Sequence, residues 1–413
     1  MLKSLLSILL ILLNLITVDI YADVTVAGNI AKTMNPAKTM EVAGEITENC
    51  DISSNKAIKN ILDKRYSVGA NFYENDYIKI DNNENIKTLY ILWDNLPEQF
   101  SIKDDLGNLI SEFNSSNNIF LHQVIEINTD IKNLSINVDK GNCKVAEIYV
   151  FGEGYLPDWV QNWKEPYKKA DMLLISTHAD DEHLFFGGTM PYYAGEINLK
   201  VQLAYLTNHY NFRVHELLNG LWAVGIRAYP IISEFNDYYS ESLEHARTIY
   251  DENEILEFQV ELLRRFKPDV VIGHDLKGEY GHGVHMLNAH TLTKALDLSN
   301  DSSIYADSAQ KYGLWDVPKC YLHLYKENIL SMNWDVPLRK FKGETAFQMA
   351  ELGFSKHVSQ TEFFKVGRRG AFDCRAFGLY RSLVGEDKLK NDFMENIDTI
   401  IRNTNKFSYD VEY

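Results

Sequence analysis

The second half of the chain alternates short apolar runs with longer amphipathic stretches, and this alternation constrains the fold more than any other feature. The apolar runs are "MLLIST", "VQLAYLT", "YPIIS", "DVVIGHD" and "CYLHLY". Helical patterns separate them, over "RVHELLNGLWAVGI", residues 242–266, a stretch beginning after Gly283, and "ETAFQMAELGF". Continuous apolar strands between helices are typical of a mainly parallel sheet covered on both faces. We therefore predict a Rossmann-like α/β domain over residues 156–413.

The preceding part of the chain has a different pattern. Residues 46–155 contain short stretches of alternating apolar and polar residues, such as "IKTLYILWDN" and "HQVIEINTD", separated by Asn, Asp and Gly. This spacing without helical patterns predicts a smaller antiparallel β-sandwich. Gly and Pro interrupt the alternation within residues 152–163, and we place the boundary between the two domains there.

The first residues resemble an export signal. Lys3 is followed by an uncharged, mostly apolar run over residues 4–18 and then by "IYA", which is the layout of a secretory signal peptide. The alternative is a retained anchor, but the run is shorter than the ~20 residues that span a bilayer. We predict a signal peptide at residues 1–22, cleaved after Ala22, and a spacer at residues 23–45. The mature protein is then secreted or extracytoplasmic, without a membrane span.

The net charge of the chain limits which classes of partner and ligand it can bind. The chain has 41 Lys and Arg against 58 Asp and Glu, a formal net charge of -17. Nucleic-acid binding depends on clustered basic residues, and no basic stripe is present. We therefore expect no nucleic-acid partner and a neutral, zwitterionic or cationic ligand.

The four cysteines leave two alternatives open. Export permits disulfides, and pairing Cys50 with Cys143 and Cys320 with Cys374 is the simplest connectivity. The other alternative is four buried thiols.

Ionisable residues follow the predicted strand "MLLIST" at once. His178, Asp180, Asp181 and Glu182 lie in the next five positions, before an apolar run resumes. In an open α/β sheet this place is the carboxyl end of a strand, where such folds bind ligands. Burying these groups is costly unless something pairs with them, and a divalent metal does so. A solvated acidic loop with a helix-capping Asp explains this segment about as well.

A second polar cluster favours the metal. The strand "DVVIGHD" is followed by "LKGEYGHGVH", in which His282 and His285 stand three apart at the start of a predicted helix. Both clusters follow strands of one sheet and can meet above it. A catalytic zinc site uses three protein ligands and leaves one position for water. His274 ends the strand and is ambiguous, and we leave it out of the ligand set because three ligands suffice.

The two motifs "THADDE" and "GEYGHGVH" together resemble the PIG-L (LmbE-like) family of zinc-dependent N-acetylglucosamine de-N-acetylases, and the likeness extends over residues 157–395. The resemblance implies that a zinc ion, or another divalent first-row metal, is held by three ligands and that a carboxylate acts as general base. The ligands are His178, Asp181 and His285, and the base is Asp180.

The resemblance also implies roles around the metal. His282 stabilises the oxyanion or donates a proton to the leaving amine, and Tyr280 is a second stabiliser. Arg213 orients the substrate, and Asp237 binds a sugar hydroxyl unless it is an ordinary surface Asp in a turn. Ala179 replaces the usual Pro, and Val284 stands where some members have an acid. We expect Glu182 to support the neighbouring ligands.

The first domain resembles, more faintly, the discoidin-like (F5/8 type C) sandwiches, on the stretches at residues 57–73 and 89–102. Such domains often bind carbohydrate, but no motif identifies a ligand here. The resulting hypothesis is an exported metal-dependent de-N-acetylase that hydrolyses the acetamide of an N-acetylglucosamine-type sugar. The alternative is a carbohydrate-binding adhesion or scaffold protein with a non-catalytic α/β half.

Overall fold

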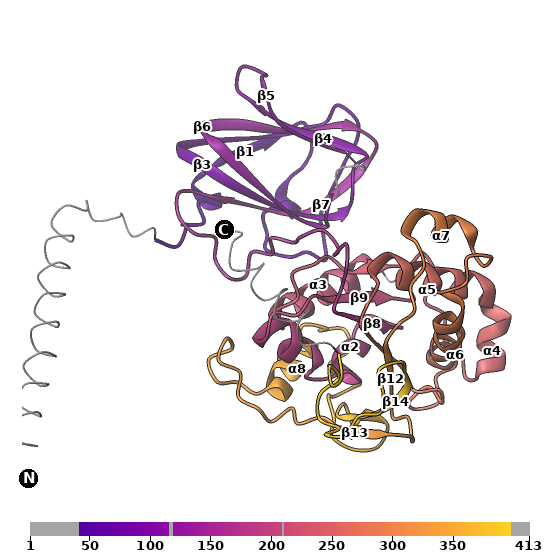
Figure 1. Ribbon diagram of the computed structural model, residues 1–413. Helices are drawn as coiled ribbons and strands as arrows, with labels where there is room; N and C mark the ends of the chain where they lie inside the picture. Colours follow the sequence, from indigo (N-terminus) through magenta and orange to yellow (C-terminus); the bar gives the residue numbers. More distant parts are fainter. Residues whose placement is uncertain (1–40, 115–118, 209, 398–413) are drawn as a thin grey trace, which may run out of the picture.

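A computed structural model describes residues 41–114, 119–208 and 210–397. The described chain forms two bodies, each built around its own sheet (Figure 1). The predicted signal peptide and nearly all of the predicted spacer lie outside the described residues. The predicted fold class, an antiparallel β domain followed by a mainly parallel α/β domain, is confirmed.

The first body is an antiparallel sheet that folds over its own core. Its strands are β1 (Asp51–Ser54), β2 (Ala70–Phe72), β3 (Tyr77–Asn95), β4 (Gln99–Asp104), β5 (Leu109–Asn114), β6 (His122–Lys140) and β7 (Cys143–Phe151). The order is β2-β7-β3-β6-β4-β5, and β1 pairs with β3. The pairing of the long strands β3 and β6 shifts register after Asp81, and the two strands stay paired on both sides of this shift. Alternate residues such as Ile78, Ile80 and Trp93 form the core.

The second body is a seven-stranded sheet. Its strands are β8 (Met172–Ser176), β9 (Val201–Tyr205), β10 (Ile231–Ile232), β11 (Val270–Gly273), β12 (Lys319–His323), β13 (Ile329–Ser331) and β14 (Ala376–Ser382). In the order β10-β9-β8-β11-β12-β14-β13, the first five strands are parallel, and β14 and β13 are antiparallel. Strand order reverses between β8 and β11, and such a switch point opens a crevice at the carboxyl ends of the strands.

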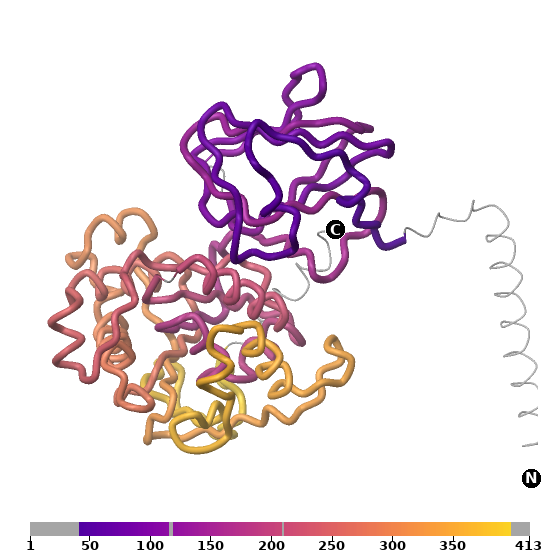
Figure 2. Tube along the Cα trace, turned by 180° about the vertical axis from the view of Figure 1, so that it is seen from behind, coloured from indigo at the N-terminus to yellow at the C-terminus, as the bar shows by residue number. Residues whose placement is uncertain are grey.

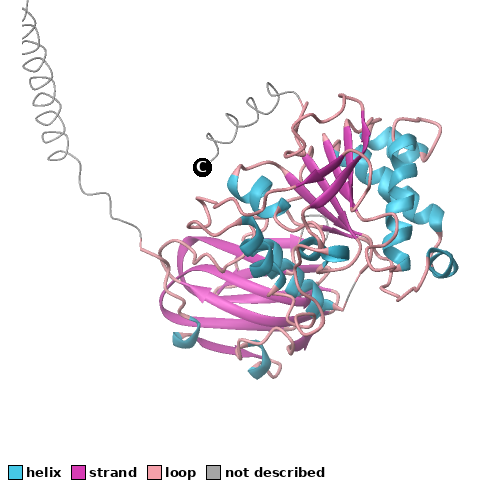
Figure 3. Cartoon of the chain, turned by 90° about the horizontal axis from the view of Figure 1, so that it is seen from below, coloured by secondary structure: helices cyan, strands magenta, loops and turns pink. Residues whose placement is uncertain are grey.

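Helices cover both faces of this sheet (Figure 3). They are α2 (Asp181–Leu184), α3 (Asn211–Ala223), α4 (Leu243–Ile249), α5 (Glu252–Phe266), α6 (Gly283–Leu298), α7 (Ala306–Tyr312) and α8 (Ala346–Phe354). Short helical turns are η1 (Thr47–Asn49), η2 (Lys59–Ile61), the π-helical η3 (Pro191–Glu196) and η4 (Gly370–Phe372). One core packs α3 and α8 against the sheet, and a separate core packs α5 and α6 against its other face. Within the described part of the chain, no helix is both long and apolar enough to cross a membrane.

The single helix predicted over residues 242–266 is wrong, since two helices occupy this segment. α4 ends before Tyr250, whose backbone is extended, and the side chain of Asp251 then caps α5 by accepting the N–H of Asn253 at 2.8 Å. The carboxylate of Asp251 satisfies a free N–H of a new helix start, so the chain begins a second helix instead of continuing the first.

Of the two alternatives for the cysteines, pairing within each half is wrong, because all four are free thiols; Cys143, Cys320 and Cys374 are buried, and Cys50 is half-buried. Cys320 belongs to the core on one face of the parallel sheet, and Cys374 belongs to the core on the other face. The sheet itself therefore separates the two sulfurs. Cys50 instead approaches the carbonyl of Ile46, at 3.3 Å.

The two bodies are in contact at α3 and at Tyr229, and Figure 2 shows the bodies from behind. Nε2 of His122, on β6, lies 2.8 Å from Nδ1 of His215, on α3, and both rings are buried. Phe120 stacks on Tyr229 with ring centroids 4.7 Å apart. The side chain of Asn211, at the start of α3, donates to the carbonyl of Asp94.

Candidate active site

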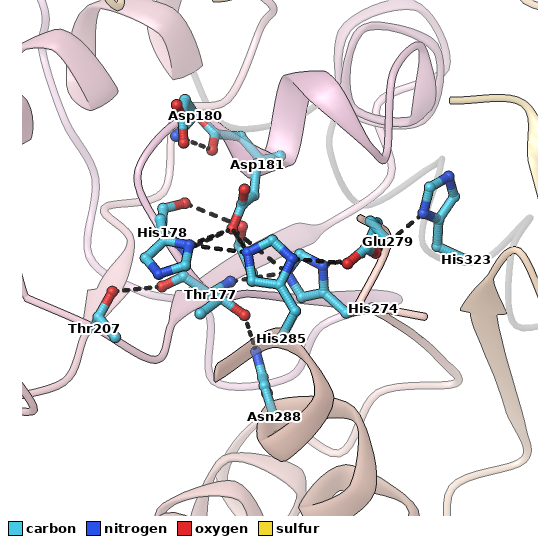
Figure 4. Close-up of polar contacts among 12 residues, drawn as sticks. Thr177, His178, Asp180, Asp181, Thr207, His274, Glu279, His285, Asn288 and His323 are labelled. Carbon is cyan, nitrogen blue, oxygen red and sulfur yellow. Dashed lines mark hydrogen bonds and ion pairs between the residues drawn. The ribbon is translucent and has the colours of Figure 1, made fainter. Parts of the chain in front are cut away.

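The loops after β8 and β11 meet at the switch point of the parallel sheet. Oδ2 of Asp181 lies 3.0 Å from Nδ1 of His178 and 3.1 Å from Nε2 of His285. The two ring nitrogens are themselves 2.9 Å apart. Figure 4 shows the three side chains converging on one point. All three are buried.

The backbone of the first loop sets this geometry. Asp180 has a φ of +124°, which is costly for a residue with a side chain, and α2 starts at the next residue. The turn lets the N–H of His178 donate to Oδ2 of Asp181 at 2.8 Å, and the N–H of Asp180 donate to Oε2 of Glu182 at 2.9 Å. As a result the neighbouring carboxylates of Asp180 and Asp181 have different partners and can have different roles.

Glu279 organises the second loop. Its carboxylate lies 2.7 Å from Nδ1 of His285, 3.0 Å from Nδ1 of His274 and 3.1 Å from Nδ1 of His323. A carboxylate on one ring nitrogen fixes the tautomer and turns the other nitrogen, as an acceptor, toward a metal. For His285 this other nitrogen is the one that faces Asp181. Glu279 is not among the predicted site residues, although it lies within the motif "GEYGHGVH".

His274 has both ring nitrogens engaged. Its Nε2 accepts the N–H of Thr177 at 2.9 Å, and its Nδ1 faces Glu279. The Nε2 atom also lies 3.7 Å from Asp181, farther than the corresponding atoms of His178 and His285. These contacts let His274 support the loop, although Asp181, His274 and His285 also form a group that could hold a metal ion.

The residues present fit a divalent metal. Two imidazole nitrogens and one carboxylate oxygen lie within 2.9–3.1 Å of one another, close enough for one ion to contact all three after a small separation, and this donor set suits zinc. Burial raises the pKa of Asp181, but the nearby His285 and His178 outweigh burial and hold this pKa well below its usual value. Asp181 is therefore ionised, as a ligand must be.

Asp180 lies beside this trio in a different electrostatic environment. Burial and the charge of Asp181 raise the pKa of Asp180 to about 7, although the Arg213 guanidinium, whose Nη2 is 3.5 Å from its Oδ1, opposes the rise. A carboxylate with a pKa near neutrality is suited to taking and returning a proton.

His282 is held neutral. Burial, followed by the charges of His178 and His285, lowers its pKa to about 3, and its Nδ1 has no hydrogen-bond partner among the described residues. A neutral imidazole donates a hydrogen bond more readily than it gives up a proton. A neutral imidazole of this kind can donate its ring N–H to an oxyanion, which is one of the two roles that the resemblance implies for His282.

A pocket of about 330 Å³ opens above the trio. Seven of the eight predicted site residues line it, and the eighth, His285, contacts the lining residue Asp181 at 3.1 Å. Asp237 is one of them: its Oδ1 lies 3.3 Å from Nε2 of His178, and its Oδ2 lies 3.8 Å from Arg213. Asp237 is therefore part of the pocket and not an isolated surface turn residue.

Three further lining residues come from segments for which the sequence analysis assigned no site role. They are Tyr239, Gln360 and Phe364. Gln360 and Phe364 follow α8, and Glu216 of α3 holds this segment by accepting the N–H and the hydroxyl of Ser359 at 2.9 and 2.6 Å. Glu182 connects to the same segment, since Nε2 of His357 lies 3.1 Å from its Oε1. Glu182 thus links the loop after β8 to the segment after α8, and its expected support of the metal ligands stays a prediction.

The comparisons with known proteins agree with the resemblance that the two sequence motifs carry. Residues 173–296 match the PIG-L family, described as GlcNAc-PI de-N-acetylase. A curated relative, 1D-myo-inositol 2-acetamido-2-deoxy-alpha-D-glucopyranoside deacetylase 1 of Catenulispora acidiphila, is 27% identical over 196 residues, covering 40% of this chain and 59% of the relative. The corresponding deacetylase of Acidothermus cellulolyticus is 28% identical, covering 33% of this chain and 56% of the relative. The chain thus spans less than two thirds of these relatives.

The matched solved structures are less similar to this chain in sequence. The N,N'-diacetylchitobiose deacetylase from Pyrococcus horikoshii is 17% identical with a TM-score of 0.35, over 47% of this chain and 72% of that one. The module CpGH89CBM32-6 of Clostridium perfringens is 14% identical with a TM-score of 0.24, over 26% of this chain and 99% of that one. The chain contains a PIG-L family domain at residues 173–296, and the discoidin-like first domain stays a prediction.

Proposed function

We propose that the protein is a zinc-dependent deacetylase that hydrolyses the acetamide of an N-acetylglucosamine-type sugar to acetate and a free amine. The observation that carries this proposal is the trio of donor atoms from His178, Asp181 and His285 with Asp180 beside it. The match to the PIG-L family and the deacetylase relatives support the same activity. Another divalent first-row metal would fit the same donors.

Five of the pocket residues have a task in this reaction besides holding the ion. When bound, the ion supplies a Lewis acid that polarises the carbonyl and acidifies water. Asp180 accepts the proton of the attacking water at its carboxylate and returns it to the departing amine nitrogen, which its pKa near 7 permits. His282 donates a ring N–H to the oxyanion, and the Tyr280 hydroxyl is a second donor. Arg213 and Asp237 hydrogen-bond the sugar hydroxyls.

The alternative of a non-catalytic α/β half receives no support from the site. A protein that had lost catalysis would be expected to lack a ligand or the base, and the predicted residues meet in one pocket. Export by a cleaved signal peptide belongs to the proposal as well. Sequencing the amino terminus of the mature protein tests it, with Asp23 as the expected first residue.

Metal analysis joined to acetate release tests the proposed activity. The mature protein is purified without added metal, and its metal content and its acetate release from N-acetylglucosamine and chitooligosaccharides are measured before and after chelation. We expect one zinc per chain and a loss of acetate release that zinc restores. Activity that survives complete chelation would contradict the proposal.

A further inference from the structure

A second pocket adjoins the first. This distal pocket has a volume of about 480 Å³ and is lined by Asn208, Tyr210, Phe212, Asn236 and Tyr238, together with Arg213 and Asp237. The last two residues also line the pocket above the metal trio. Both volumes lie in the range of small-molecule sites. The shared residues place the two pockets side by side.

The distal pocket follows the edge of the parallel sheet. Asn208 and Asn236 lie just beyond the carboxyl ends of β9 and β10, and their backbones form a parallel bridge. The metal trio lies beyond the carboxyl ends of β8 and β11, next along the same edge. The two pockets therefore lie along four neighbouring strands, and together they extend farther than one sugar ring needs.

The distal pocket exposes aromatic rings beside amides. Tyr210 is 79% exposed, Tyr238 54% and Phe212 40%. The rings of Tyr210 and Phe212 are nearly parallel, with an interplanar angle of 6° and centroids 6.1 Å apart. Exposed large apolar groups gathered at a pocket mark a binding site more often than scattered ones do. Flat rings can pack against the C–H face of a pyranose, while amides hydrogen-bond its hydroxyls.

The charge of the distal pocket points to a neutral ligand. Arg213 is the one cationic side chain among its described lining residues, and this guanidinium already lies 3.5 Å from Asp180 and 3.8 Å from Asp237. A phosphate-bearing headgroup would need more positive charge than this. The hydroxyl groups of an uncharged sugar suit one acid, one guanidinium and two amides.

We infer that the distal pocket is a second saccharide subsite, so that the substrate is a neutral oligosaccharide or polysaccharide chain and not a single sugar or a phosphoglycolipid. This inference rests on the proposed deacetylase function and selects among its substrate classes. The contact of Asn211 with Asp94 of the first domain braces the stretch that carries Tyr210 and Phe212.

The test compares sugars of increasing length on the zinc-loaded mature chain. We expect kcat/KM for acetate release to be about tenfold or more higher with chitobiose and chitotriose than with N-acetylglucosamine. The double variant Tyr210→Ala/Tyr238→Ala should lose about tenfold on the oligosaccharides and stay within about twofold on the monosaccharide. Tyr73→Ala, which removes a half-exposed ring of the first domain, is the control and should change neither. Equal effects on both substrate lengths, or no effect on either, would overturn the subsite.

A binding measurement separates this inference from the proposed function. If no acetamide is hydrolysed, the proposed function fails, and calorimetric titration of the zinc-loaded Asp180→Asn variant with chitotriose and N-acetylglucosamine still tests the subsite. Tighter binding of chitotriose that is lost in the triple variant Asp180→Asn/Tyr210→Ala/Tyr238→Ala supports it. Equal binding of the two sugars, or no binding of either, overturns it.

Discussion

Oε2 of Glu279 lies 2.7 Å from Nδ1 of His285, and this contact directs the opposite nitrogen of the ring toward Asp181. The same carboxylate approaches His274 and His323, so one buried side chain positions three imidazoles. Burial raises the pKa of Glu279, but His274 and the hydrogen bonds from the three rings outweigh burial and hold this pKa well below its usual value. The metal trio thus depends on a residue that does not touch the metal position.

Glu279→Gln tests this dependence. An amide presents one acceptor oxygen and an NH₂ that cannot accept from a second ring, so the orientation of His285 is no longer fixed. We expect zinc affinity to fall about 10- to 100-fold, measured by competition with a chromophoric chelator. Glu48→Gln, at an exposed position of the first domain, is the control. An unchanged zinc affinity would show that Glu279 serves the fold alone.

The acid limb of the pH profile should report Asp180. The base works only when ionised, so kcat falls as the pH drops through the pKa of Asp180, which is about 7 without metal and lower once a cation is bound beside it. Because the charge of Arg213 lowers this pKa, Arg213→Gln should move the acid limb to higher pH. The measurement is kcat against pH for both proteins under saturating substrate. A shift toward lower pH would contradict the assignment.

His282→Gln distinguishes the two roles expected for His282, which are stabilisation of the oxyanion and donation of a proton to the leaving amine. A donor to the oxyanion accelerates the reaction without titrating in the working range, since the pKa of His282 is lowered to about 3. We expect kcat to fall about 10²- to 10³-fold while the zinc content and the shape of the pH profile stay as in the wild type. Loss of the alkaline limb in the variant would instead identify His282 as the proton donor to the amine.

The contact between the domains should weaken in acid. Burial lowers the pKa of His215 from 6.5 to about 4, so the unfolded chain binds a proton between about pH 6.5 and pH 4 that the folded protein does not. The free energy of unfolding therefore falls as the pH decreases through this window, by up to about 3 kcal/mol from this residue. Denaturant unfolding of the wild type and His215→Asn at pH 7 and pH 5 measures it. The variant should lose less stability between these pH values, and an equal loss would contradict this account.

Much of the fold was predictable because its signals are local. The apolar run before His178 and the run before His274 predicted buried parallel strands, and the structure has β8 and β11 there. Placing both motifs at strand ends followed from this, and the structure brings them into one pocket. The roles of the individual side chains stay predictions.

The features that were missed depend on contacts between distant segments. Nothing near Glu279 in the sequence indicates that it reaches His323, on β12. Gln360 and Phe364 enter the pocket because Glu216 anchors their segment through Ser359, a contact that spans more than a hundred residues of the chain. The break between α4 and α5 is a local signal that was overlooked, since Asp251 is a typical helix cap.

The central claim is that Asp180 is the base of a metal-dependent deacetylation, and Asp180→Asn tests it most directly. The wild type, this variant and the exposed control Asp105→Asn are loaded with zinc, their metal content is measured, and acetate release from chitobiose is followed. We predict that all three bind one zinc per chain and that only Asp180→Asn loses activity, by about 10²- to 10⁴-fold in kcat. Unaltered acetate release by a zinc-loaded Asp180→Asn protein would contradict the account.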